Sequence, residues 1–453
     1  MLFQPSFSHA PTSSPEPVKG GSTGNAYVER AHSWQTAAQA ALLVSAAALC
    51  ILLAPLPPPF QRPLICADVL SIGNRAHILV NCDSESFVEL ARGPSTVLET
   101  NSVRQTRPGY GAIAWLMSFP FRAVNQILEL MPAQVHRLMT APFDPYYAGC
   151  VTLNWISLIV ALMLLADLIG ARSLLDSAAV VPVSILLVNH ITKAFFWTPH
   201  QQVIGLSSAV IAMWIARRTI IVEGRVGVPA AAGLGLVSGA ACLVYGAFVL
   251  VPASGTIALW LFCNRKTRNR KVRLTSVLWL GTVAPLIAWY TFIIERTGSF
   301  YSRETSYYHE FVWIAERLNE GFSSLLAALW KNLASFLGTF PAALGLPIAF
   351  LGLAFLLAVT RNKRFPKASI DDVAVMSALS FLLAAVPFYS LMGFYDPRLT
   401  AALAAPLVVL AGSALRDAFR EPTTRPNAIV PEPITLAAVA YIAIVVLIRG
   451  PYA

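Results

Sequence analysis

Apolar stretches of roughly twenty residues recur along this 453-residue chain, and they restrict its fold more than any other feature. Each stretch is long enough to cross a bilayer as one helix. Only 12% of the residues are charged and 56% are hydrophobic, which excludes a water-soluble globular protein. We expect an all-α polytopic membrane protein with about ten to twelve transmembrane helices. The predicted helices lie near 37–56, 110–131, 149–169, 177–196, 203–216, 228–246, 248–263, 274–294, 336–359, 372–393, 399–415 and 433–449.

Clusters of Lys and Arg separate several of these stretches. The densest are 265–273 and 361–367, and 217–218 and 416–425 are weaker. Short loops rich in these residues mark the cytoplasmic side of a membrane protein. Aromatic residues do not alternate with the cations, as a single-strand nucleic-acid binder requires. The positive charge therefore predicts the orientation of the chain and some attraction to membrane lipid, and no nucleic-acid partner.

Two longer segments, 60–108 and 295–335, are predicted on the other side of the membrane, and both are expected to carry short interfacial helices. Large loops at one face with tight basic loops at the other are not required of a channel or carrier. An enzyme that works at one membrane face does require them.

The remaining boundaries concern the N-terminus and one ambiguous segment. Residues 1–33 are rich in Pro, Ser and Gly and are predicted to form a disordered cytoplasmic tail, so 34–453 forms the transmembrane domain. Within 110–131 the apolar run stops at Arg122, so this segment is either a tilted span or an interfacial helix.

The first outer loop contains an acidic segment at the start of a predicted short helix. Asp83 and Glu85 stand just before Ser86, and Ser86 and Glu89 have the spacing of a capping box. The Gly-Pro pair at 93–94 ends the predicted helix. The start of a helix holds anions well, so this is a candidate site. The alternative is that Asp83 or Ser86 only caps the helix.

Two cysteines lie in the same loop. Cys66 and Cys82 are candidates for a disulfide, which would stabilise the fold by about 3 kcal/mol in an oxidising compartment. The alternative is two free thiols, because sequence alone does not show proximity.

These motifs resemble those of the GT-C glycosyltransferases, polytopic enzymes that use polyprenyl-phosphate sugars and include protein mannosyltransferases and aminoarabinose transferases. Asp83-Ser84-Glu85 is similar to their outer-loop Asp-x-Glu motif, and 106–110 (Thr-Arg-Pro-Gly-Tyr) is similar to the Arg-Pro-x-Tyr that opens their next hydrophobic segment. The segment 395–399 (Tyr-Asp-Pro-Arg-Leu) resembles the entry to a late helix of the family. One departure is 197–202, where several members have an acidic residue before a proline and this chain has no carboxylate.

The resemblance implies a GT-C-like helical bundle and an inverting transfer. Asp83 is then the base that takes the acceptor proton, and Glu85 assists it or binds acceptor or metal. A carboxylate pair alone is a weak metal signal, so the metal is left unknown and a divalent cation stays open. The lipid phosphate needs positive charge, for which Arg107, Lys193 and Arg398 are candidates.

Further residues are candidates for binding the rest of the substrate. Tyr110 belongs to the Arg-Pro-x-Tyr segment, and His200 has the alternative of a hydrogen-bonded histidine inside a helix bundle. Arg303 and His309 lie among aromatic residues of the second outer loop, which suit stacking on sugar rings and a membrane-interface belt equally well.

The sequence therefore predicts a glycosyltransferase of the cell inner membrane with a periplasmic active site. Its expected partners are a polyprenyl-phosphate-linked sugar donor and a glycan, lipid or protein acceptor. Two alternatives stay open: a secondary transporter or flippase, which would need ionisable residues near mid-bilayer, and a non-catalytic subunit of a polysaccharide assembly complex.

Overall fold

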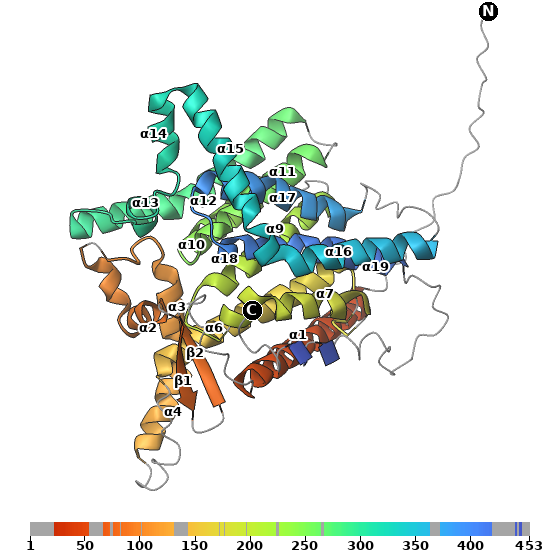
Figure 1. Cartoon of the computed structure of the whole chain (residues 1–453), viewed down its shortest axis with the longest axis horizontal. Helices are drawn as coiled ribbons and strands as arrows, with labels where there is room; N and C mark the ends of the chain where they lie inside the picture. Colours follow the sequence, from red (N-terminus) through yellow and green to blue (C-terminus); the bar gives the residue numbers. More distant parts are fainter. Residues whose placement is uncertain are drawn as a thin grey trace, which may run out of the picture.

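The computed structural model describes most of the chain and is overwhelmingly helical (Figure 1). The described residues are 22–53, 67–72, 76–81, 83–100, 102–130, 144–171, 173–175, 177–195, 197–222, 226–263, 267–362, 372–418, 440–441 and 444–445.

The elements follow one another along the chain with short connections. The first half contains α1 (Ser22–Leu53), β1 (Ala67–Ile72), β2 (Ala76–Asn81), α2 (Ser84–Arg92), η3 (Pro94–Leu98), α3 (Pro108–Met117), α4 (Phe119–Glu129), α6 (Pro145–Ile169), α7 (Ser177–Val188), α8 (His190–Phe195) and α9 (Gln202–Ile221). The second half contains α10 (Val228–Cys242), η4 (Gly246–Val249), α11 (Leu250–Leu261), α12 (Arg268–Thr297), α13 (Arg303–Ser306), α14 (Val312–Glu320), α15 (Phe322–Gly338), α16 (Phe340–Asn362), α17 (Val373–Met392), α18 (Pro397–Thr400), η5 (Ala401–Leu403) and α19 (Ala404–Ala418).

Six stretches of helix among the described residues are long and apolar enough to cross a membrane. They are Pro145–Ile169, Gln202–Ile221, Arg268–Thr297, Phe340–Thr360, Val373–Met392 and Pro397–Arg416, and three shorter apolar helices accompany them. This confirms an essentially all-α, multi-pass membrane protein. The total of ten to twelve spans stays a prediction, and most of the predicted helix 433–449 lies outside the described residues.

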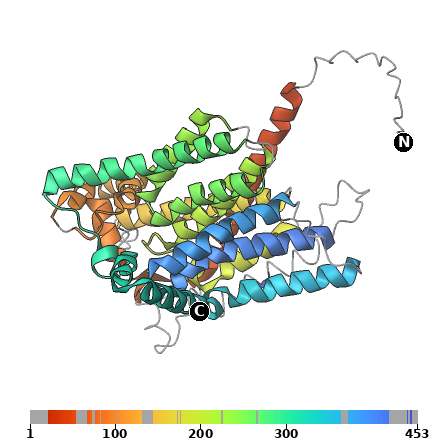
Figure 2. The ribbon, with the colours of Figure 1, turned by 90° about the horizontal axis from the view of Figure 1, so that it is seen from above.

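The long helices run side by side (Figures 1 and 2). The residues at their two ends differ in kind. At one face, the loop end, α2, α13 and α14 gather. The opposite face, the basic end, is held by ion pairs between helix ends. Arg416 binds Asp372 at 2.8 Å, and Arg217 binds Asp167 at 2.7 Å. Asp372 also caps α17 by accepting a hydrogen bond from the backbone N–H of Ala374. These contacts align α6, α9, α17 and α19 at the same level.

Small residues let several helices of the bundle approach closely. α9 packs against α6, α11, α17 and α19, and α10 packs along α12. A Cβ atom added at Gly239 of α10 would lie 2.2 Å from the carbonyl oxygen of Thr282 on α12. Only glycine permits that crossing, because lipid tails supply no hydrophobic force and helices associate there through close packing.

The segment 110–131 does not form one continuous span. Its helix breaks at Ser118 into α3 and α4, and both pieces pack against α6. The Arg122 guanidinium on α4 lies 5.8 Å from the Tyr146 ring in the first turn of α6, at the loop end. Whether the two pieces lie across or along the membrane surface stays a prediction.

The N-terminal part differs from the sequence prediction in two further places. Helix α1 begins at Ser22, inside the segment predicted to be a disordered tail; residues 1–21 lie outside the described residues. The first outer loop contains an antiparallel hairpin, β1–β2, which the helix-centred sequence prediction missed. Its register pairs Ala67 with Asn81. Cys66 and Cys82 lie outside the described residues, so their disulfide stays a prediction.

Candidate functional site

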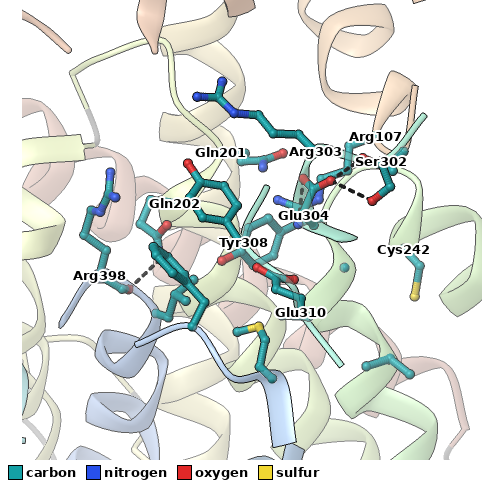
Figure 3. Close-up of a pocket in the computed structure, with 18 of the residues that line it drawn as sticks. Arg107, Gln201, Gln202, Cys242, Ser302, Arg303, Glu304, Tyr308, Glu310 and Arg398 are labelled. Atoms are coloured by element: carbon teal, nitrogen blue, oxygen red, sulfur yellow. Dashed lines mark hydrogen bonds and ion pairs between the residues drawn. The ribbon is translucent and has the colours of Figure 1, made fainter. Parts of the chain in front are cut away.

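The loop end contains a cavity of about 360 Å³ between the two outer loops and the ends of the helices. Its walls come from segments far apart in the sequence: the start of α2, the segment before α3, the start of α9, the segment around η4, α13 with the turn after it, and the α17–α18 connection. Figure 3 shows side chains from these segments converging on one space. The polar residues that line it include Asp83, Arg104, Arg107, His200, Gln202, Tyr245, Arg303, Glu304, Tyr308, Glu310, Tyr389, Asp396 and Arg398.

Asp83 stands at the N-cap position of α2, but its side chain makes no capping hydrogen bond. Its carboxylate instead lies 3.5 Å from Nε2 of His200 and 3.8 Å from the Arg104 guanidinium. The His200 hydrogen bond lowers the pKa of Asp83 to about 2, with further help from the charges of Arg104 and Arg398 and against the cost of burial. The capping alternative for Asp83 therefore does not account for its contacts.

His200 is buried and its ring orientation is fixed from both sides. Nδ1 accepts a hydrogen bond from the backbone N–H of Gln202 at 3.1 Å, which leaves Nε2 to carry the proton toward Asp83. Burial lowers the pKa of His200 more than the neighbouring carboxylate raises it. At neutral pH the pair is therefore a neutral imidazole that donates to an ionised Asp83.

Arg104 supplies fixed positive charge next to Asp83. Its guanidinium donates to Ser86 Oγ at 2.8 Å and lies 4.0 Å from the centre of the Phe87 ring. Because these contacts hold the side chain and only 14% of it is exposed, its charge adds to the field inside the cavity.

An ion pair joins the two outer loops across the cavity. Arg107, from the first loop, lies 3.2 Å from Glu304 on α13 (Figure 3). Glu304 also accepts hydrogen bonds from Thr106 and Ser302. Burial opposes ionisation of Glu304, but Arg107 and the hydrogen bonds outweigh it, so the pKa of Glu304 lies below its ordinary value. Gln105 adds two backbone contacts to the same junction: its side-chain oxygen accepts from Tyr301 N–H and its carbonyl accepts from the Trp289 indole, both at 2.8 Å.

Two further arginines line the cavity. Arg398 on α18 binds Asp396 at 2.9 Å, and its carbonyl accepts a hydrogen bond from the Gln202 side chain (Figure 3). Arg303 lies over the rings of Tyr307 and Tyr308, at 5.6 and 5.9 Å. Within the part of the chain that the structure describes, no carboxylate forms an ion pair with Arg303.

Glu310 lies in a strained turn between α13 and α14. Both neighbours have positive φ angles, 53° at His309 and 62° at Phe311, and such a conformation costs about 1 kcal/mol or more for each non-glycine residue. Burial raises the pKa of Glu310 to about 7; Arg107 opposes this rise and Glu304 adds to it. Among the described residues its carboxylate has no hydrogen-bond or ion-pair partner. The hydroxyl of Tyr389, buried in the cavity wall, also has no such partner there.

Of the residues proposed from the sequence, the structure brings five into this cavity: Asp83, Arg107, His200, Arg303 and Arg398. Four others lie elsewhere. Glu85 is exposed on α2, and the buried Tyr110 donates a hydrogen bond to Asn154 at 3.3 Å. Lys193 is buried in α8 outside the cavity lining, and the 64% exposed side chain of His309 lies 3.9 Å from Glu316.

Sequence reasoning missed Arg104, Glu304, Tyr308 and Glu310. All four lie in the predicted outer loops, and for the last three the available signal was the mixture of aromatic and charged residues in 301–310. What the sequence does not contain is their pairing across about 200 residues of chain, for example Thr106 with Glu304, 198 positions apart.

The donor set of the cavity does not suit a tightly held metal. Among the described residues, no group of three or more His, Cys, Asp or Glu is arranged to hold an ion. Two of the cavity carboxylates, Glu304 and Asp396, are neutralised by arginines at 3.2 Å or less, and Asp83 lies near a third arginine. We therefore derive no chemical step through a cation.

Comparison with protein-family models, curated proteins and solved structures gives no match to this chain.

Proposed function

We propose that the protein is a membrane glycosyltransferase that moves a sugar from a polyprenyl-phosphate donor to an envelope glycan, lipid or protein acceptor. The observation that carries this proposal is the cavity at the loop end, where carboxylates and arginines from both outer loops face one space of about 360 Å³. Pockets for small ligands start at about this size. The GT-C resemblance of the motifs around Asp83, Arg107 and Arg398 agrees with it.

The orientation follows from the positive charge. The basic end of the bundle carries Arg217 of α9 and Arg416 of α19, which belong to two of the Lys and Arg clusters, and we assign this end to the cytoplasm. The loop end then faces the opposite compartment, which is the periplasm if the protein lies in the inner membrane of a bacterium. Lipid-linked sugars that have been translocated present their head groups at that face.

An apolar groove next to the cavity supports a lipid-borne donor. It is formed by α15 and α17, with a volume of about 440 Å³, and is lined by Leu326, Leu329, Trp330, Leu333, Val386, Pro387, Ser390 and Leu391. The same helix, α17, presents Phe388, Tyr389 and Met392 to the polar cavity. A donor with its head group in the cavity could therefore lay its polyprenyl tail against the apolar groove on the other side of α17.

The reaction requires two things of the protein. The acceptor oxygen forms a bond to the anomeric carbon while the bond from that carbon to the phosphate oxygen breaks, and the phosphate leaves with the electron pair. Arg303 and Arg398 hold the departing phosphate, because guanidinium groups make bidentate contacts with phosphate oxygens. Arg104 and Arg107 add positive charge from the other wall. Direct displacement inverts the configuration at the sugar carbon.

Asp83 contacts the acceptor in this proposal. The resemblance implies that it removes the acceptor proton, and its carboxylate oxygens are suited to receive the hydrogen bond of a hydroxyl. With a pKa of about 2, however, Asp83 is a weak base, because proton transfer is most efficient when the base has a pKa near the working pH. Its stronger contribution is to orient the acceptor hydroxyl between itself and His200.

The experiment that tests the function compares amide variants of two acidic residues at the start of α2. Purified protein in nanodiscs is incubated with a panel of radiolabelled polyprenyl-phosphate sugars and an envelope extract from a deletion strain. We expect transfer by the wild type and by Glu85→Gln, whose side chain is exposed and outside the cavity. Asp83→Asn should lose transfer by at least about 100-fold.

A transporter and an assembly subunit predict different results. In a deletion strain, an enzyme leaves a sugar missing from the envelope while its lipid donor accumulates. A flippase would leave the donor confined to the cytoplasmic leaflet, and a non-catalytic subunit would tolerate Asp83→Asn without loss of product. Unchanged product from a well-expressed Asp83→Asn variant would therefore contradict the proposal.

A further inference from the structure

Glu310 is a carboxylate of the cavity that the sequence did not single out. It lines the same space as Asp83 and Arg398, on the wall formed by the second outer loop, and Figure 3 shows it among the labelled side chains of the cavity. The other cavity carboxylates are engaged by cationic or imidazole side chains: Asp83 by His200, Glu304 by Arg107 and Asp396 by Arg398. Within the described part of the chain, the Glu310 side chain has no such contact.

Hydrogen bonds hold the backbone around Glu310 in a conformation with positive φ angles, which is unfavourable for non-glycine residues. Its N–H donates to the carbonyl of Glu304 at 3.0 Å, and the N–H of Phe311 donates to the carbonyl of Met392 at 3.1 Å. The Phe311 ring packs on Phe388 of α17, with ring centres 5.7 Å apart. These contacts tie the turn to α13 and to the end of α17 despite the positive φ angles on both sides of Glu310. Strain of this kind is kept where the surrounding structure fixes a side chain for a task.

The groups that face Glu310 come from every wall of the cavity. Arg107, before α3, and Glu304, on α13, act on its charge with opposite sign. Tyr245, before η4, lies near enough for its own ionisation to be opposed by the Glu310 charge. From α17 the wall contributes the hydroxyl of Tyr389, which has no hydrogen-bond partner among the described residues. The carboxylate is therefore placed in a polar space with capacity to bind a hydroxyl of a ligand.

We infer that Glu310 takes up the proton of the acceptor hydroxyl, an assignment that rests on the glycosyl transfer proposed above. In the step, the acceptor oxygen bonds to the anomeric carbon and its proton passes to a Glu310 carboxylate oxygen. The bond between the anomeric carbon and the phosphate oxygen breaks, and the phosphate departs with that electron pair toward the arginines. Charge and atoms balance without a further reactant.

The division of labour between the two carboxylates follows from their surroundings. Asp83 is stabilised as an anion by His200 and Arg104, so it holds a hydrogen bond and gives up a proton readily. Glu310 has the opposite environment: burial raises its pKa to about 7, where a carboxylate accepts a proton most effectively near neutral pH. Pairs of acids whose environments separate their pKa values in this way are typical of acid–base sites.

The test is a pH profile of transfer in nanodiscs for the wild type, Glu310→Gln, Glu310→Asp and a control. The control is Glu316→Gln, which makes the same chemical change six positions later on α14. Its side chain is exposed, and among the described residues its ion-pair partner is His309, at 3.9 Å. Wild type and control should gain activity as pH rises through about 7. Glu310→Gln should lose about 100-fold or more in turnover and lack this rise, and Glu310→Asp should keep the rise at reduced turnover.

A second readout, independent of activity, separates the ways in which the inference can fail. The infrared carboxyl band of the folded protein should titrate near pH 7 in the wild type and in Glu316→Gln, and not in Glu310→Gln. If the wild type transfers sugar and Glu310→Gln keeps the rise near pH 7, another group takes the proton and the inference is wrong while the function stands. If the wild type transfers no sugar from any donor, the function fails, and the inference fails with it even if the carboxyl band titrates as expected. Cooperative unfolding transitions at pH 4, where Glu310 is mostly protonated in the folded and the unfolded chain, verify that each variant is folded.

Discussion

Replacing Glu310 with Gln should make the protein more stable at alkaline pH, because it removes a carboxylate whose charge the fold disfavours. Burial raises the pKa of Glu310 from 4.5 to about 7. At about 1.36 kcal/mol for each pKa unit, this difference opposes folding by about 3 kcal/mol once the group is ionised in both states. Water at the open side of the cavity screens part of the charge, so we expect about 2 kcal/mol.

The sign of the pH dependence is fixed by the direction of this shift. Below pH 4.5 the carboxyl is protonated in the folded and the unfolded chain, and it has no effect on stability. Between pH 4.5 and about 7 the unfolded chain loses the proton first, so wild-type stability falls as pH rises. Above pH 7 the full cost is present. Glutamine carries no charge at any of these values, so the variant should match the wild type at pH 4.5 and exceed it at pH 8.5.

The assay is unfolding of nanodisc-embedded protein, followed by tryptophan fluorescence at pH 4.5 and 8.5. Glu316→Gln is the matched control, since its carboxylate is exposed and should show no such difference. Equal wild-type and Glu310→Gln midpoints at both pH values would refute the reasoning, because they would mean that the Glu310 carboxylate is solvated in the folded protein. A Glu310→Gln variant less stable at pH 8.5 would refute it too, by revealing a cationic partner.

Three further predictions concern other parts of the molecule. Asp83→Asn should cost only about 1 kcal/mol of stability, because the drop of the Asp83 pKa from 3.8 to about 2 is screened at a side chain that is 40% exposed. This stability is present above about pH 4 and is lost as pH falls toward 2. Denaturant unfolding at pH 7 should therefore find the variant folded although transfer is lost. Gly239→Val should destabilise the α10–α12 crossing by about 1–3 kcal/mol, whereas Gly233→Val, whose Cβ meets nothing within 4 Å, should be nearly neutral in the same thermal assay. Cys66 and Cys82 stand next in sequence to the paired strand residues Ala67 and Asn81, so non-reducing mass spectrometry of the protein isolated from its membrane should find them joined, and two free thiols would contradict this.

The sequence predicted the features of the fold that depend on local composition. Apolar runs and basic clusters are read within windows of about twenty residues, and they located the long helices and the basic end. The segment 110–131 was harder, because its apolar run stops at Arg122 and the sequence left two alternatives open. The break at Ser118 lies where the chain packs closely on α6: a Cβ on Gly149 would meet the Ala114 carbonyl at 2.3 Å.

The sequence predicted one carboxylate of the candidate site and some of its arginines, but it did not predict the full set of residues that line the cavity. Asp83 and Arg398 stand beside short motifs, so local reading found them. Glu304 and Glu310 have no motif of their own, and their chemistry depends on partners such as Arg107 that arrive from another loop. Lys193 and Tyr110 show the opposite case: they were candidates for substrate contact from charge and from a short motif, and the structure buries both side chains outside the cavity lining.

The junction at Gln105 and Arg107 also has a consequence for how the protein is made. Helices enter a membrane in chain order, and the walls of the cavity are contributed by segments from Asp83 to Arg398. When α9 has been inserted during synthesis, Asp83 and His200 are in place, but Glu310 and Arg398 have not yet been inserted. Under the proposed function, a lipid-linked sugar would find no complete binding site on such an intermediate, and the protein would become able to turn over the donor only when nearly the whole polypeptide has been inserted.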